Sequence, residues 1–317
     1  MTLNKQAFSK KNLLLTGATG FIGKALFNRL INSEEKFNIF VISRRPEKDN
    51  YFTDRGAEYI VGDISDYKIF EKMDKTFDVI IHAAGCVSNS PKNKINPIVT
   101  ENICRLALEN NVERLIYISS VSVVSGNKEV PLSEDLPYLG STPYAESKIA
   151  AEKVVIEYRE KGLPVIILRP PIVYGKGEPH YLPTLSKFLK VRALPLPEGG
   201  KARFHMVYIE NLVDAIIFSL ETDKMFSGTY FVADSQVLQA GQVFSIMAEG
   251  LGVKPPIYLN DFYSKLFSWI PLVRKLIKFF MKERVYSTEK IESLGFCCSV
   301  NASDALLLCT ERKCDEK

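Results

Sequence analysis

Residues 12–23 have the sequence NLLLTGATGFIG, in which a short apolar run leads directly into three glycines spaced three residues apart. The apolar run is typical of a buried β-strand, and Phe21–Ile31 has apolar residues at helical spacing. Gly17 allows a tight turn, Gly20 lets a pyrophosphate approach the backbone, and Gly23 lets the helix pack on the sheet. Phosphates then lie at a helix N-terminus, where amide hydrogens and the helix dipole favour anions. The strand–turn–helix context therefore predicts a dinucleotide site, although glycines alone also mark ordinary turns.

Short apolar runs alternate with longer helical patterns through the first half of the chain. Continuous apolar strands separated by helices are typical of a parallel sheet covered on both faces, so we predict an α/β, doubly wound (Rossmann) fold. The helical patterns include Pro97–Asn110 and Tyr144–Lys161. The predicted strands are Asn12–Thr16, Asn38–Ser43, Glu58–Val61, Asp78–His82, Arg114–Ser119 and Pro164–Leu168.

After Arg169 the regular alternation stops, prolines become frequent, and a strand-like run returns only at Thr229–Ala233. This change indicates a smaller, discontinuous C-terminal region. We predict a dinucleotide-binding domain over residues 1–175 and 206–235. The substrate-binding region is predicted over residues 176–205 and 236–317.

The composition is that of a globular protein, because 46% of the 317 residues are hydrophobic and 25% are charged. A net charge of +4 is too weak to indicate a nucleic-acid partner. The six cysteines show no CxxC spacing, and His180 and His205 are isolated, so no metal site is predicted. Residues 1–11 are polar and do not resemble a secretory signal. We therefore expect reduced thiols and a cytoplasmic location.

The second predicted strand ends in Ser43-Arg44-Arg45, where an NAD enzyme usually has an acidic residue for the adenosine ribose. Two guanidinium groups instead suit a 2′-phosphate, so Arg44 and Arg45 favour NADP, with NAD as the alternative if both are merely solvated. Asp63 follows the third strand and is predicted to accept from the adenine amino group. A simple turn aspartate fits the same position.

Tyr144 and Lys148 open the helix that follows the fifth strand and lie one turn apart on one face. A phenol with a pKa near ~10 is a poor base at neutral pH, but a nearby ammonium lowers that pKa. The pair is therefore a candidate acid/base that exchanges a proton with an alcohol or carbonyl as hydride moves. Upstream, Ser119 and Ser120 lie at the carboxyl end of a predicted strand, where ligands bind in such sheets.

Taken in order, these motifs resemble those of the extended short-chain dehydrogenase/reductase superfamily, in its NAD-dependent epimerase/dehydratase group. The resemblance covers about residues 12 to 215, and a late LGF at 294–296 also fits. The matching stretches are TGATGFIG (16–23), GDISD (62–66), HAAG (82–85), ISS (118–120), YAESK (144–148), RPPIVYG (169–175) and VYIENLVDA (207–215).

The resemblance implies a role for particular residues. Tyr144 is the implied catalytic acid/base, Lys148 lowers its pKa and holds the nicotinamide ribose, and Ser120 orients the substrate. One residue is inserted between the serines and Gly126, which keeps Ser119 and Ser122 as alternatives to Ser120. The implied cofactor-binding residues are Gly17, Thr19, Gly20, Phe21, Ile22, Gly23, Arg44, Arg45, Asp63, Ile64, Ala83, Ala84, Gly85, Tyr144, Lys148, Pro170, Ile172 and Val173.

The sequence gives fewer indications of the residues that bind the substrate. In sugar-nucleotide members of the family a basic residue near Arg203 binds the diphosphate, and an exposed loop cation is the alternative. The segment 262–284 combines aromatic residues with a basic amphipathic pattern. This pattern fits peripheral membrane contact, a helix packed on a domain, or a lid over an apolar substrate.

We expect an NAD(P)-dependent oxidoreductase that reduces a keto group, or oxidises a hydroxyl, of a small-molecule substrate. The alternatives are a nucleotide-sugar 4-epimerase or dehydratase, a 3β-hydroxysteroid-dehydrogenase-like enzyme, and a non-catalytic NADP-binding sensor. The family resemblance also implies a homodimer, since many members pair through helices that flank the active site.

Overall fold

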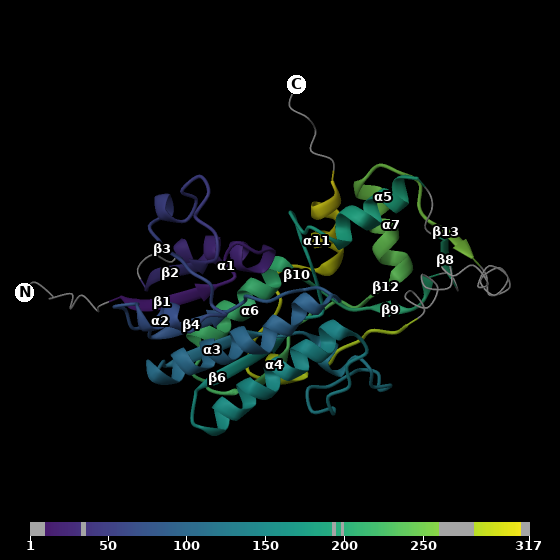
Figure 1. The fold of residues 1–317 in the computed structure, drawn as a ribbon. Helices are drawn as coiled ribbons and strands as arrows, with labels where there is room; N and C mark the ends of the chain where they lie inside the picture. The colour runs from purple at the N-terminus through teal and green to yellow at the C-terminus, as the bar shows by residue number, and fades with distance from the viewer. Residues whose placement is uncertain (1–9, 33–35, 192–194, 198–199, 260–281, 312–317) are drawn as a thin grey trace, which may run out of the picture. The chain divides into compact units, whose positions relative to one another are not determined.

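The computed structural model describes residues 10–32, 36–191, 195–197, 200–259 and 282–311. Most of the segment 262–284, including its expected amphipathic helix, lies outside these residues. Figure 1 shows the helices and strands of the fold. By contacts, the described chain divides into two compact units. The first comprises residues up to Ser119, Gly140–Leu168 and Ser219–Gly228. The second comprises Ser120–Leu139, Arg169–Phe218 and the residues from Thr229 onward. These boundaries are not those of the predicted functional regions, which remain predictions.

A seven-stranded parallel sheet, in the order β11-β6-β5-β4-β1-β2-β3, confirms the doubly wound α/β fold. The strand order reverses between β4 and β1, as it does where doubly wound sheets bind ligands. The strands are β1 (Lys11–Thr16), β2 (Phe37–Ser43), β3 (Glu58–Val61), β4 (Val79–His82), β5 (Arg114–Ile118), β6 (Val165–Arg169) and β11 (Gly228–Phe231).

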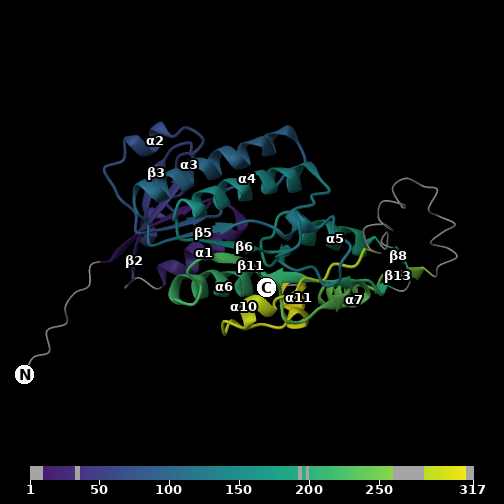
Figure 2. The ribbon, with the colours of Figure 1, turned by 90° about the horizontal axis from the view of Figure 1, so that it is seen from below.

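Helices of the first unit cover both faces of this sheet. In Figure 2, α3 and α4 run side by side on one face and α1 lies on the other. Alternate strand residues such as Leu14, Ile80 and Leu115 pack with Ile103 of α3 and Val155 of α4, because successive strand residues point to opposite faces. These helices are α1 (Phe21–Ile31), α2 (Lys68–Glu71), α3 (Ile95–Glu109) and α4 (Pro143–Glu160), with short 3-10 turns at η1 (Thr53–Arg55) and η2 (Pro91–Lys94).

The second unit has its own core, formed largely where α7 packs against α11 and α5. Its strands pair as β7 with β10, β9 with β12 and β13 with β8. Its elements are η3 (Val121–Val124), β7 (Ile172–Tyr174), α5 (Tyr181–Lys190), β8 (Pro195–Pro197), β9 (Arg203–Phe204), β10 (Met206–Tyr208), α6 (Ile209–Glu221), β12 (Leu238–Gln239), α7 (Ala240–Gly250), β13 (Ile257–Leu259), α10 (Glu289–Glu292) and α11 (Ala302–Thr310).

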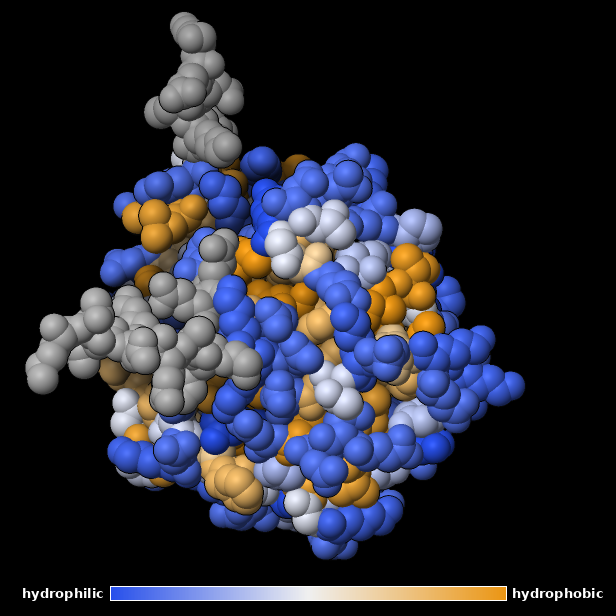
Figure 3. All heavy atoms as spheres, turned by 90° about the vertical axis from the view of Figure 1, so that its left-hand side faces the viewer, coloured by the Kyte–Doolittle hydropathy of each residue, from blue (hydrophilic) through white to orange (hydrophobic). Residues whose placement is uncertain are grey.

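The face of the molecule seen in Figure 3 is mainly hydrophilic, with hydrophobic residues in several separate areas. No helix among the described residues is long and apolar enough to cross a membrane.

Candidate active site

The carboxyl ends of the strands in the first unit meet at one edge of the sheet. Thr16, the last residue of β1, pairs with Ile42 of β2 and His82 of β4, and His82 pairs with Tyr117 of β5. The predicted residues Gly17, Arg44, Asp63, Ala83 and Ser119 each follow one of these strands. The parallel register therefore places the glycine turn, the arginine pair and the first serine along the same edge, where ligands bind in open parallel sheets.

The glycine turn is packed so closely that two of its glycines leave no room for a side chain. Gly17 has a φ of +75°, and a Cβ there would lie 2.6 Å from the Ala84 nitrogen. A Cβ on Gly23 would lie 2.1 Å from the Gly17 carbonyl oxygen. The Gly20 amide donates to that same oxygen at 2.9 Å, and no side chain caps α1, which begins at Phe21. A tight turn that leads into an uncapped helix N-terminus fits a dinucleotide pyrophosphate.

We expect Gly23→Ala to lower the free energy of unfolding by about 1–3 kcal/mol, because the added methyl group must displace backbone atoms. Gly20→Ala is the matched control, since its Cβ would meet only the Gly17 oxygen, at 3.3 Å, and its backbone is extended. Urea denaturation of the two variants compares them directly. Equal losses of stability would contradict the packing role of Gly23.

Helix α4 begins where the sequence pattern predicts, and its first residues explain why. The Thr142 side chain accepts a hydrogen bond from the Ala145 amide at 3.1 Å, and Pro143 occupies the first turn. This cap sets the start of the helix beside Tyr144, whose own amide donates to the Asn89 side chain at 3.2 Å. Tyr144 is half-buried and Lys148, one turn later, is buried.

Lys148 places its ammonium group at the ends of β4 and β5. Its Nζ donates to the Tyr117 hydroxyl at 3.1 Å and to the Ile118 carbonyl at 2.8 Å. A Cβ added at Gly85, just beyond β4, would lie 3.9 Å from Nζ. Burial lowers the pKa of Lys148 to about 8, and the opposing influence is the negative charge of Glu152. The lysine therefore faces the loop that packs on the glycine turn.

Asn96 of α3 ties that same loop to α4. Its side chain accepts from the Cys86 amide at 2.7 Å and donates to the Cys86 carbonyl at 3.1 Å and the Ser147 hydroxyl at 3.0 Å. Ser147 precedes Lys148 and itself donates to the Tyr144 carbonyl at 2.8 Å. These bonds fix the first turn of α4 against the end of β4.

The adenosine end predicted from the sequence lies on exposed residues. Arg44 and Arg45 follow β2 and are exposed, as a 2′-phosphate site requires. Asp63 is exposed after β3, and its carboxylate accepts from the Ser65 amide at 3.0 Å and the Ser65 hydroxyl at 2.9 Å. These bonds form the turn that was the alternative interpretation of Asp63, and they leave its second carboxylate oxygen for other partners.

The three candidate serines differ in their surroundings. In the second unit the Ser120 hydroxyl accepts from the Ser122 amide at 3.2 Å and caps η3. The Ser119 and Ser122 hydroxyls are buried, and within the described part of the chain neither has a hydrogen-bond partner. A buried hydroxyl with no partner is costly, so both alternatives to Ser120 have unused hydrogen-bonding capacity.

The other predicted ligand residues belong to the second unit. Pro170 is buried, and the half-buried Ile172 and Val173 lie on β7. Arg203 donates to Glu283 at 2.9 Å through Nε and at 2.5 Å through Nη2. Its predicted role at a diphosphate would require this forked ion pair to open.

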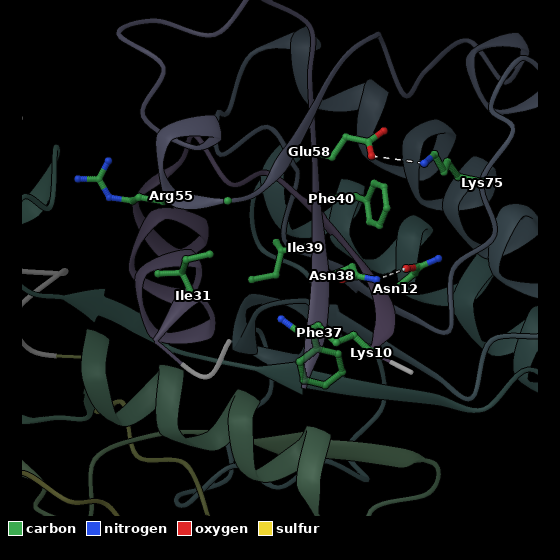
Figure 4. Close-up of a pocket in the computed structure, with 11 residues that line it drawn as sticks. Lys10, Asn12, Ile31, Phe37, Asn38, Ile39, Phe40, Arg55, Glu58 and Lys75 are labelled. Atoms are coloured by element: carbon green, nitrogen blue, oxygen red, sulfur yellow. Dashed lines mark hydrogen bonds and ion pairs between the residues drawn. The ribbon is translucent and has the colours of Figure 1, made fainter. Parts of the chain in front are cut away.

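A groove of about 520 Å³ lies at the opposite edge of the sheet, near the amino ends of β1, β2 and β3 (Figure 4). The Asn38 side chain donates to Asn12 across it at 3.1 Å, and Lys75 pairs with Glu58 at 3.5 Å. Arg55 also lines it. Because the glycine turn follows the carboxyl end of β1, this groove is not the predicted nucleotide site.

Comparison with known proteins found similar epimerases and reductases. UDP-glucose 4-epimerase of Vibrio cholerae is 27% identical over 286 residues, which are 84% of this chain and 85% of the epimerase. The 2-alkyl-3-oxoalkanoate reductase of Stenotrophomonas maltophilia is 25% identical over 257 residues, 76% of each chain. The structure of UDP-glucuronic acid 4-epimerase from Bacillus cereus in complex with NAD has a TM-score of 0.72 at 21% identity, covering 95% of this chain and 97% of its own.

These findings define an NAD(P)-dependent enzyme of the extended short-chain dehydrogenase type. The chain belongs to the NAD dependent epimerase/dehydratase family, whose model matches residues 13–233. Both the family resemblance and the enzyme class predicted from the sequence are therefore confirmed.

Two residues beside Lys148 are not singled out by the sequence. Tyr117 lies in an apolar strand, where an aromatic residue is typical of a core, and Glu152 lies on a helix rich in charges. The sequence could have indicated Glu152, because it lies four residues after Lys148 and residues at this spacing are neighbours on a helix. Nothing local indicates that Tyr117 contacts Lys148. Among the described residues, no group of three or more histidines, cysteines or acidic residues is arranged to hold a metal ion.

Proposed function

We propose that this enzyme uses NADPH to reduce a keto group of a small-molecule substrate, and catalyses the reverse oxidation of the hydroxyl when NADP⁺ is supplied. The observation that carries the proposal is the exposed pair Arg44–Arg45, which follows β2 where an NAD enzyme usually has an acidic residue. Because NADPH is the usual cellular reductant, selection for the 2′-phosphate favours net reduction. Relatives that include a 2-alkyl-3-oxoalkanoate reductase support the same direction.

The proposed chemistry uses the tyrosine and lysine of α4. When bound, the nicotinamide cofactor would supply the hydride that the carbonyl carbon takes up. Tyr144 gives its phenolic proton to the carbonyl oxygen, and the Lys148 ammonium stabilises the phenolate that results. Ser120 holds the substrate oxygen in this proposal. The tight turn at Gly17 and Gly20 and the N-terminus of α1 would hold the pyrophosphate, and Gly23 would let α1 pack against that turn.

A nucleotide-sugar 4-epimerase is the second candidate, favoured by the similarity to the Vibrio cholerae enzyme along most of both chains. Such an enzyme oxidises and re-reduces its substrate within one turnover. The Arg203–Glu283 pair weighs against it, because the guanidinium that would bind a diphosphate is already matched by a carboxylate. The reductase is therefore the function that the residues support best.

Turnover assays separate these functions. The purified enzyme is incubated with NADPH and a panel of ketones while the absorbance of the reduced nicotinamide is followed. Substrate-dependent loss of absorbance supports the reductase. Conversion of a UDP-sugar to its 4-epimer, with tightly held NAD and no net absorbance change, supports the epimerase instead. Nucleotide binding without turnover across both panels contradicts both and indicates a sensor.

Arg44→Ala should weaken NADPH binding by about 1–3 kcal/mol, roughly fivefold to 150-fold, because it removes a charged hydrogen bond to the 2′-phosphate. Binding of NADH should hardly change. Titration calorimetry with both nucleotides measures the difference. Arg55→Ala is the matched control, since Arg55 is equally exposed but lies at the opposite edge of the sheet. Equal losses for NADPH and NADH would refute the assignment.

A further inference from the structure

The surroundings of the Lys148 ammonium are more specific than a tyrosine–lysine pair requires. Lys148 is only 6% exposed, and two hydrogen bonds orient its Nζ, to the Tyr117 hydroxyl at 3.1 Å and the Ile118 carbonyl at 2.8 Å. An ammonium has three N–H donors, so one remains once the two bonds to described residues are counted. The position that a side chain would take at Gly85 lies 3.9 Å away. The third donor is therefore available on the side of the loop that follows β4.

Tyr117 is buried and lies against this ammonium. The tyrosine is 1% exposed, its ring stacks on His82 with centroids 5.5 Å apart, and Lys148 Nζ lies 4.6 Å from the ring centroid. Burial raises the pKa of Tyr117 well above its ordinary value. It therefore remains a neutral phenol, whose oxygen accepts from Lys148 and whose ring face attracts the cation.

Contacts through His82 link Tyr117 to the strand that leads into the glycine turn. Thr16 Oγ1 and His82 Nδ1 are 2.8 Å apart, and His82 Nε2 and Thr100 Oγ1 are 3.2 Å apart. His82 in turn stacks on the Tyr117 ring, with centroids 5.5 Å apart. The same Thr16 hydroxyl accepts from the Ala84 amide at 3.3 Å. Burial, and then the charge of Lys148, lower the pKa of His82 to about 3, so this histidine is neutral.

The charged and titratable groups that face Lys148 come from four elements. Glu152 of α4 is fully buried and acts electrostatically on both Lys148 and Tyr117. Tyr144 of α4 and Cys104 of α3 interact with the Tyr117 hydroxyl. His82 of β4 and Tyr117 of β5 complete the set. Glu152 carries the opposite charge, so it is the group that offsets the burial of the ammonium.

We propose that Tyr117 is a positioning residue for Lys148: its phenol and the Ile118 carbonyl hold the ammonium in one orientation, with Glu152 as the opposing charge, so that the remaining N–H faces the loop at Gly85. This inference rests on the proposed function, in which Lys148 stabilises the Tyr144 phenolate. Tyr117 thus acts through Lys148 and touches neither the substrate nor the hydride. The contacts through His82 connect Tyr117 to the strand that carries the glycine turn.

The test measures the titration of Lys148 in the nucleotide-free protein, by NMR of chain labelled with ε-¹³C lysine. The Lys148→Met protein, which lacks one signal, assigns the resonance. Tyr117→Phe keeps the ring and removes the acceptor, so we expect the midpoint to fall by about one pH unit, the equivalent of a hydrogen bond to a charged group. Glu152→Gln should lower it as well. Tyr158→Phe, another tyrosine of the same unit, should leave it unchanged.

The pH–rate profile of ketone reduction is the second measurement. In Tyr117→Phe the profile should move to lower pH by the same amount as the Lys148 midpoint. An unchanged midpoint in Tyr117→Phe overturns the proposal, and so does a profile that stays in place while the midpoint moves. If the wild-type enzyme reduces no ketone, the proposed function fails. The NMR midpoint still shows in that case whether Tyr117 controls the titration of Lys148.

Discussion

Tyr144→Phe should lower kcat for ketone reduction by at least about a hundredfold and leave nucleotide affinity nearly unchanged. General acid–base catalysis typically contributes 10²–10⁴-fold, and phenylalanine retains the ring but has no proton to give. The half-buried position of Tyr144 in the first turn of α4 means that the loss of one hydroxyl disturbs little packing. The effect therefore belongs to the chemical step.

Single-turnover measurements with saturating NADPH, together with calorimetric titration of the nucleotide, check this expectation. Tyr158→Phe is the matched control, because Tyr158 lies near the other end of the same helix and also loses only a hydroxyl. Tyr158→Phe should keep full activity. Normal turnover in Tyr144→Phe would remove this tyrosine from the mechanism and would leave the acid/base role to another group.

Lys148→Met should abolish activity and yet make the protein more stable. Burial holds the pKa of Lys148 at about 8, below its ordinary value of 10.5, so the folded state bears a cost for the charged ammonium at neutral pH. The free-energy equivalent of that depression is about 3 kcal/mol. In the variant the Ile118 carbonyl and the Tyr117 hydroxyl lose a donor, and the buried Glu152 loses its opposing charge. These losses offset much of the gain, so we expect an increase in unfolding free energy of at most about 1 kcal/mol at pH 7.

The pH dependence has a definite sign. Below pH 8 the lysine is charged in both the folded and the unfolded chain, and the whole cost of burial is present. Between pH 8 and 10.5 the folded chain releases its proton first, so the wild-type protein gains stability relative to Lys148→Met. The advantage of the variant should therefore be largest at pH 7 and shrink toward pH 10.5.

Chemical denaturation of both proteins at several pH values measures this difference. Lys153→Met on the exposed face of the same helix is the control, and we expect its stability to stay within about 0.5 kcal/mol of wild type. A Lys148→Met protein that is less stable than wild type at pH 7 would show that the hydrogen bonds of Lys148 outweigh its burial. A gain in stability joined to a loss of activity would show that this position is kept for catalysis.

The sequence by itself determined the sheet, the glycine turn and the start of α4. Runs such as Asn12–Thr16 and Asp78–His82 were predicted to within one residue, since each buried parallel strand is a continuous apolar run that needs no partner to be recognised. The spacing of Tyr144 and Lys148 was equally visible, because four residues make one helical turn. The short pairs β7–β10 and β9–β12 were not predicted, as strands of two or three residues have no measurable period.

Only the tertiary structure decided which groups meet the functional side chains. Tyr117 lies 31 residues from Lys148 and Glu283 lies 80 residues from Arg203, so no local pattern joins either pair. The parallel register of β4 and β5 places Tyr117 beside His82, and the packing of α4 brings the lysine onto it. Contacts of this kind depend on chain segments that meet only when the sheet has formed. Local spacing therefore predicts the candidate catalytic side chains, whereas long-range packing decides which polar and charged groups surround them.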